Sequence, residues 1–163
     1  MRKVFSEALV EMGKGKPVEE ALVTASRRGS REETRNTLWA ALSLFLHVRE
    51  STGWGPLRTV RELSSHPERW KNPYLEEVDL LMNLSPGVLS ELFRKAEKRR
   101  EAGYSLEDSL EMASAAMDPD SANLLFRTAL FLVKTISSLR DIGENAAFRE
   151  MRASAAKSLC LKE

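Results

Sequence analysis

The sequence has little of what metal sites and covalent cross-links are built from. Its 163 residues include one cysteine, Cys160, and two histidines, His47 and His66. A single cysteine cannot form an internal disulfide, and there is no Cys/His cluster of the kind that binds zinc. Neither histidine stands at i, i+4 from another ligand type, so both are expected to be ordinary, partly exposed side chains. We therefore predict no metal and no cofactor, and the thiol suits a reducing cytoplasm.

Long apolar runs and a net charge are lacking as well. The longest apolar stretch, Leu38 to Val48, is about half of the ~20 residues that cross a bilayer. Glu7 and Glu11 stand where a secretory signal needs an apolar core. Lys and Arg number 25 against 24 for Asp and Glu, so the overall charge favours neither nucleic acid nor an acidic membrane as partner. We expect a soluble chain without a transmembrane segment, whose electrostatic contacts come from local patches.

The sequence also lacks the alternation that is typical of strands. No segment alternates with period two, and no Asn-Gly or Asp-Gly turn separates apolar runs, whereas apolar residues recur at helical spacing throughout. We predict an all-α fold, a helical bundle of about eight or nine helices in a single domain over residues 1–163. The helices are expected at about residues 2–12, 17–26, 31–51, 57–66, 74–84, 86–102, 105–117, 118–142 and 146–159.

The third of these helices has the clearest local signals. Ser30 followed by Glu33 is a capping box, in which each residue satisfies an amide that the helix start leaves without a partner. Between Leu38 and Val48 the helix is apolar nearly all round, so we expect other helices to surround it. Trp54, between two glycines just after it, is either an exposed anchor or a side chain folded onto the core.

A twelve-residue motif occurs twice, 88 residues apart. Residues 15–26 read GKPVEEALVTAS and residues 103–114 read GYSLEDSLEMAS, identical at five positions. The same offset pairs Ser30 with Asp118, two preferred N-caps that each precede a long apolar helix. In the second copy, Ser105 and Asp108 are spaced as a cap pair for the seventh helix. We predict two pseudo-symmetric helical repeats, about 2–66 and 86–160, packed face to face and joined by a linker helix at about 74–84. The alternative is that any two amphipathic hairpins with glycine turns look alike.

The motif resembles the helical cytoplasmic domain of the F-type platform proteins. These are inner-membrane components of type II secretion, type IV pilus and archaellum machines, and their helical domain occurs twice. The resemblance covers residues 15–25 and 103–113, and elsewhere only the order of helices. It implies a non-enzymatic scaffold that contacts an assembly ATPase, in the cytoplasm at the inner face of the membrane. Platform proteins carry transmembrane helices, so this chain would be an excised cytoplasmic portion or a soluble relative.

Charged side chains supply the candidate sites. Glu19–Glu20 and Glu107–Asp108 are paired carboxylates, and their place in the first turn of a helix explains them through the helix dipole. Two basic clusters are either solvated helix faces or a surface for acidic partner residues, lipid headgroups or phosphates. The candidate partner-contact residues are Arg27, Arg28, Arg31 and Arg35 in the first cluster and Arg94, Lys95, Lys98 and Arg99 in the second.

These observations leave three classes of function. The first is a protein-interaction scaffold with a protein partner, for which a homo-oligomer is also open. The alternative is a small helical nucleic-acid-binding or regulatory protein that uses the basic helix faces. The third is an enzyme whose site forms only in the fold, but the sequence has no nucleophile elbow and no phosphate-binding glycine loop. We predict no catalytic residue and no enzymatic activity.

Overall fold

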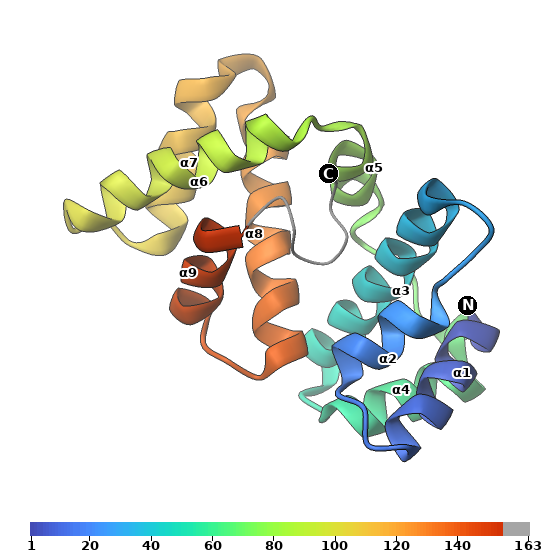
Figure 1. The fold of residues 1–163 in the computed structure, drawn as a ribbon. Helices are drawn as coiled ribbons and strands as arrows, with labels where there is room; N and C mark the ends of the chain where they lie inside the picture. The colour runs from blue at the N-terminus through green and yellow to red at the C-terminus, as the bar shows by residue number, and fades with distance from the viewer. Residues whose placement is uncertain (155–163) are drawn as a thin grey trace. The chain divides into compact units, whose positions relative to one another are not determined.

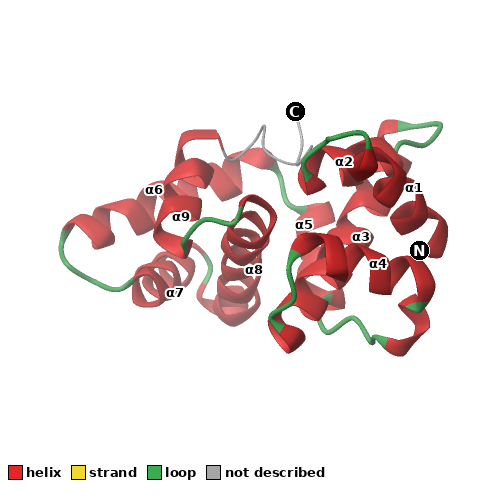
Figure 2. Ribbon diagram, turned by 90° about the horizontal axis from the view of Figure 1, so that it is seen from below, coloured by secondary structure: helices red, strands yellow, loops and turns green. Residues whose placement is uncertain are grey.

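The computed structural model describes residues 1–154, without the side chains of Pro86, Ala153 and Ser154. These residues form nine α-helices and no strand (Figures 1 and 2), which confirms the predicted all-α helical bundle. Two single 3₁₀ turns, η1 (Pro67–Arg69) and η2 (Pro119–Ser121), were not predicted. The helices are α1 (Arg2–Gly13), α2 (Val18–Ala25), α3 (Arg31–Thr52), α4 (Pro56–Ser65), α5 (Leu75–Asn83), α6 (Pro86–Glu101), α7 (Leu106–Met117), α8 (Ala122–Arg140) and α9 (Glu144–Ser154).

The chain divides into two compact units. Unit 1 comprises residues 1–74 together with 138–140, and unit 2 comprises residues 75–137 and the chain from 141 onward. In unit 1, α1 packs along both α2 and α4, and in unit 2, α6 packs along α7 and contacts α9. The predicted linker helix is α5, and it clusters with unit 2. The face-to-face packing of two repeats stays a prediction.

The bounds of the helices follow the 88-residue offset. Helices α2 and α7 begin at Val18 and Leu106, and α4 and α9 begin at Pro56 and Glu144. Helices α1 and α6 end at residues 13 and 101, and α3 and α8 end at residues 52 and 140. Helices α1 to α4 of unit 1 therefore correspond in order to α6 to α9 of unit 2, which also contains α5 and has the turn η2 before α8.

The two copies of the motif form the same corner. Gly15 and Gly103 have φ of 96° and 101°, in the left-handed region that favours glycine. The amide of Gly15 donates to the carbonyl of Met12 at 3.0 Å, and the amide of Gly103 donates to that of Arg100 at 3.0 Å. The next amides, of residues 16 and 104, donate to the carbonyls of residues 11 and 99 at 3.3 and 3.1 Å. In both copies these bonds satisfy carbonyls at the end of the preceding helix.

The corners place matched apolar side chains in the cores. Phe5, Ala8, Leu22 and Ala25 are almost fully buried, and so are their counterparts Phe93, Ala96, Leu110 and Ala113. Since helical residues three or four apart lie on one face, each pair of helices contributes one apolar stripe to its own unit. Helix α3 is buried from Leu38 to Val48 except at Ala40 and His47, as predicted.

Helix starts carry the predicted caps, with one difference. The hydroxyl oxygens of Ser30 and Ser105 accept from the amides of Glu33 and Asp108, each at 3.1 Å. Asp118 also acts as a cap, since its Oδ1 accepts from the amide of Asp120 at 3.2 Å. It caps the turn η2, and the eighth helix begins only at Ala122, because Pro119 opens a tighter 3₁₀ turn before the α-helical bonds start.

The last predicted helix corresponds to α9 as far as Ser154. Its expected continuation to about residue 159, and Cys160, lie outside the described residues. One helical stretch within residues 1–154, Pro119–Arg140, is long and apolar enough to cross a membrane by length and composition, with a mean hydropathy of 1.2. Half of it is buried inside the structure, as in the core helix of a globular domain. The expectation of a chain without a transmembrane segment stays a prediction.

Candidate partner-contact site

The first basic cluster lies at the connection between α2 and α3. Helix α2 ends at Ala25 and α3 begins at Arg31, so Arg27 and Arg28 are in the loop and Arg31 and Arg35 are in the first two turns of α3. Arg27, Arg28 and Arg31 are exposed and Arg35 is half-buried. The structure therefore brings these four residues onto one corner of unit 1, as their spacing in the sequence suggested.

Arg28 is engaged by the corner itself. Its guanidinium donates to the carbonyls of Ala25 and Arg27 at 3.1 and 2.6 Å, where a cation interacts well with the carbonyl end of α2. Its backbone amide donates to the hydroxyl oxygen of Thr34 at 2.8 Å, and that hydroxyl donates to the carbonyl of Ser30 at 2.9 Å. Arg28 thus closes the loop between two helices and contributes to the fold.

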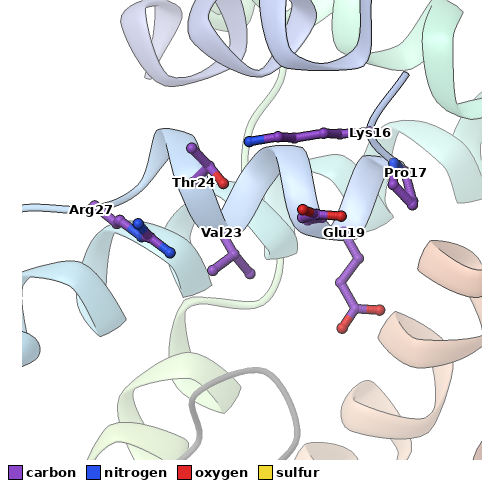
Figure 3. A pocket seen from close by; sticks show the side chains of 7 residues that line it. Lys16, Pro17, Glu19, Val23, Thr24 and Arg27 are labelled. Atoms are coloured by element: carbon purple, nitrogen blue, oxygen red, sulfur yellow. The ribbon is translucent and has the colours of Figure 1, made fainter. Parts of the chain in front are cut away.

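Arg27 has a different environment. Its side chain has no hydrogen-bond or ion-pair partner among the described residues, and it borders an open hollow on α2 (Figure 3). The hollow is lined by Lys16, Pro17, Glu19, Glu20, Val23, Thr24 and Arg27. Lys16 is paired with Glu11 at 2.7 Å, and this hydrogen bond is the main cause that lowers the pKa of Glu11 below its ordinary value. The lining mixes both signs of charge, so the hollow itself selects no particular class of ligand.

The second basic cluster is largely neutralised by one carboxylate. Arg94 binds Glu91 through two hydrogen bonds, Nε to Oε2 at 2.9 Å and an Nη to Oε1 at 2.5 Å. The Lys95 ammonium lies 3.6 Å from Oε1 of the same side chain. The hydrogen bond from Arg94 is the main cause that lowers the pKa of Glu91 to about 2, and the pair raises the pKa of Arg94. These two cations are therefore committed to their own helix.

The rest of the second cluster lies in the last turn of α6. Basic residues are stabilised there by the negative end of the helix dipole. Arg99 donates to the carbonyl of Lys95 at 3.3 Å, and Arg100 donates to the carbonyl of Tyr104 at 2.9 Å and to Oδ1 of Asn145 at 2.7 Å. Lys98 is exposed and has no such partner among the described residues. Arg99 is therefore engaged by its own helix and the neighbouring Arg100 by α9, whereas Lys98 is the member of the cluster without a partner among residues 1–154.

His47, His66 and Trp54 each contact neighbouring aromatic or charged side chains. The ring of Trp70 makes edge contacts with His47 at 5.9 Å and with Trp54 at 6.3 Å between ring centres. The guanidinium of Arg58 lies 4.3 Å from the ring centre of Trp54, which is half-buried. Nδ1 of His66 is 3.8 Å from Glu68. Within residues 1–154 no group of three His, Cys, Asp or Glu side chains is arranged to hold a metal ion.

The two pairs of carboxylates lie in the first turns of helices, as expected. Glu19 and Glu20 lie in the first turn of α2, and Glu107 and Asp108 lie in the first turn of α7. Negative side chains there interact with the positive end of the helix dipole. Since the two pairs are also 88 residues apart, they belong to the repeated corner.

Several large apolar residues among those described are exposed and were not recognised as surface features in the sequence: Met1, Val10, Leu57, Leu75, Tyr104 and Met112. Leu57, Val60 and Leu63 recur at helical spacing in the fourth helix, but only Val60 and Leu63 of these three are buried, and Leu57 is 42% exposed. On α1, Val10 is 60% exposed. The signal was present in the sequence, because the offset of 88 pairs Val10 with Lys98 and Leu57 with Asn145.

The chain matches no family model, no curated protein and no solved structure.

Proposed function

We propose that this chain is a non-enzymatic scaffold that works by protein contact, as the resemblance to the cytoplasmic domain of F-type platform proteins implies. The observation that supports it best is the repeated corner. The motif that carries the resemblance builds the same glycine turn at residues 15 and 103, with matched hydrogen bonds and matched buried side chains on both sides. A helical unit that occurs twice is a property of the platform family.

The partner in this proposal is the assembly ATPase of a secretion or pilus-type machine, met in the cytoplasm at the inner face of the membrane. Helical units with ordered corners present rigid rows of side chains, and rigid rows lose little conformational entropy when a partner binds. A nucleic-acid-binding role has less support, because Arg94 and Lys95 are held by Glu91 and Arg28 by backbone carbonyls. Cations that are already paired release fewer counterions from phosphates.

Binding of the purified chain to the assembly ATPase of the same genome tests the proposal. The chain is immobilised, and the ATPase is added over a micromolar concentration series with and without nucleotide. We expect saturable binding with a micromolar Kd, as for contacts within dynamic assemblies. Duplex DNA is the competing analyte, and its affinity should be low and should fall further when the salt concentration rises. A chain that binds DNA with a steep salt dependence and ignores the ATPase contradicts the proposal.

A further inference from the structure

The outer side of the α1 and α4 pair combines apolar and basic side chains. Ser6 and Ser64 share a hydrogen bond of 2.8 Å, and Arg2 pairs with Glu68 at 3.1 Å, so the two helices run antiparallel along each other. We call their exposed side chains the α1–α4 face. They are Arg2, Lys3, Glu7 and Val10 on α1, and Leu57, Arg58, Arg61 and Ser65 on α4.

Unit 2 provides an internal reference for this face. Its corresponding helices, α6 and α9, expose Ser90, Lys98, Glu101, Glu144, Asn145 and Arg149 among the side chains described. None of these is apolar. The positions of Val10 and Leu57 are filled in unit 2 by polar residues, of which Lys98 is exposed and Asn145 accepts a hydrogen bond from Arg100 of α6. Val10 is also a β-branched residue, which has a lower helix propensity than lysine. The exposed parts of Val10 and Leu57, 60% and 42% of the residues, are apolar surface that a partner can cover.

The exposed charges on the α1–α4 face are mostly basic, since Arg2, Lys3, Arg58 and Arg61 stand against the single carboxylate of Glu7. Lys3 and Arg61 are exposed and have no ion-pair partner among the described residues, and Arg58 lies against the ring of Trp54. Glu7 is the one exposed carboxylate on α1 and α4, since Glu11 is held by two lysines and Glu62 accepts from Trp70. An apolar centre with a basic rim fits a partner with an apolar centre and an acidic rim.

We propose that the α1–α4 face docks an amphipathic helix of a partner protein, with its apolar side on Val10 and Leu57 and its acidic residues beside Lys3 and Arg61. The occupant is a helix because two antiparallel helices form a groove in which a third can pack by ridges and grooves. The inference rests on the proposed function and names the kind of segment that the scaffold binds.

A synthetic peptide tests the docking face directly. The probe is a fluorescein-labelled helix of roughly 20 residues with Leu on one face and Glu on the others, and its companion has Lys in place of every Glu. Fluorescence anisotropy at low and high salt gives the affinities for the full chain. We expect the acidic peptide to bind, with an affinity that falls as salt rises, and the basic peptide not to bind.

Variants of the chain locate the binding. The double variant Val10→Lys with Leu57→Asn installs the residues that the chain itself carries at 98 and 145, so the fold should accept them. It should weaken the acidic peptide by about tenfold or more, since it removes both apolar contacts. Arg61→Glu should weaken it by a similar factor. Arg149→Glu, the same change at the corresponding position of unit 2, should alter the affinity by less than about twofold. Far-UV circular dichroism checks that each variant is folded.

Any of three results overturns the inference: equal binding of the two peptides, no binding of the acidic peptide, or unchanged binding of the acidic peptide by the folded double variant. The experiment with the ATPase separates this inference from the proposed function. If the wild-type chain and the double variant bind the ATPase equally, the scaffold role is supported and docking at the α1–α4 face is contradicted. If the acidic peptide binds at the α1–α4 face and the ATPase does not bind at all, docking at this face is supported and the proposed partner is contradicted.

Discussion

In unit 1 the chain turns at Gly15 and begins a helix at Val18, and in unit 2 it turns at Gly103 and begins a helix at Leu106. The agreement extends to the end of the long helices, where Gly53 and Asp141 both have positive φ. Each of these positions is fixed by backbone geometry or by burial, so a change there disturbs the fold of its unit.

The exposed surfaces of the two units agree much less. Arg27 and Arg28 correspond to Ala115 and Ala116, and Lys3 corresponds to Glu91. Exposed side chains can change at little cost in stability, so matching surfaces are not required by the fold. Where a surface position departs toward an apolar residue, as at Val10 and Leu57, the docking face that we propose accounts for the departure.

The largest effect expected from this comparison is in the cores. Phe5 and Phe93 are both fully buried, so Phe5→Ala and Phe93→Ala should each lower the free energy of unfolding by about 3–5 kcal/mol. Urea unfolding followed by circular dichroism measures the loss. If an alanine variant is unfolded, Phe→Leu at the same two positions allows the two cores to be compared instead. Its expected cost in the free energy of unfolding is below about 1.5 kcal/mol. A difference of more than about 2 kcal/mol between the two alanine variants would show that the cores are not packed alike.

The second largest effect on stability is expected from substitutions at the two glycine corners. Gly15→Ala and Gly103→Ala force a side chain into the left-handed region and should each cost about 1–2 kcal/mol in the free energy of unfolding. Gly29 is the matched control, because it is also in open space but does not have a positive φ. Gly29→Ala should be neutral or stabilising by up to about 1 kcal/mol, since alanine restricts the unfolded chain. If all three variants lost the same stability, the glycines at the corners would have no special conformational role.

Most of the fold could be predicted because its signals are local. Helical periodicity gave the nine helices, and Ser30 and Ser105 gave two caps that the structure confirms. The single turns η1 and η2 could not be separated from helix, because one turn is too short to show a period.

Less of the candidate site could be predicted. The pairing of Arg94 and Lys95 with Glu91 follows from spacings of three and four residues on one helix, so it was accessible in the sequence. The turn of Arg28 onto the carbonyls at the end of α2 depends on the path of a loop, and the bond from Arg100 to Asn145 depends on the packing of two helices. Helical periodicity predicts neither the path of a loop nor the packing of one helix on another.

The smallest effect concerns an ion pair that unit 2 has and unit 1 lacks. Glu91 corresponds to Lys3, and its partners Arg94 and Lys95 correspond to Ser6 and Glu7, so the pair cannot form in unit 1. Because the folded-state pKa of Glu91 is lowered from 4.5 to about 2, its contribution to stability is present above pH 4.5 and is lost as the pH falls toward 2. Carbon-13 NMR of the glutamate carboxyl groups follows this titration.

In that titration Arg94→Ala should return the pKa of Glu91 most of the way to 4.5, since the hydrogen bond from Arg94 is the main cause of the shift. Lys3→Glu is the control in unit 1. It supplies the carboxylate without the two cations, so the new group should titrate near the ordinary value for glutamate. A wild-type Glu91 that also titrates near 4.5 would mean that its pair with Arg94 is open in solution, and the cations of the second cluster would then be available to a partner after all.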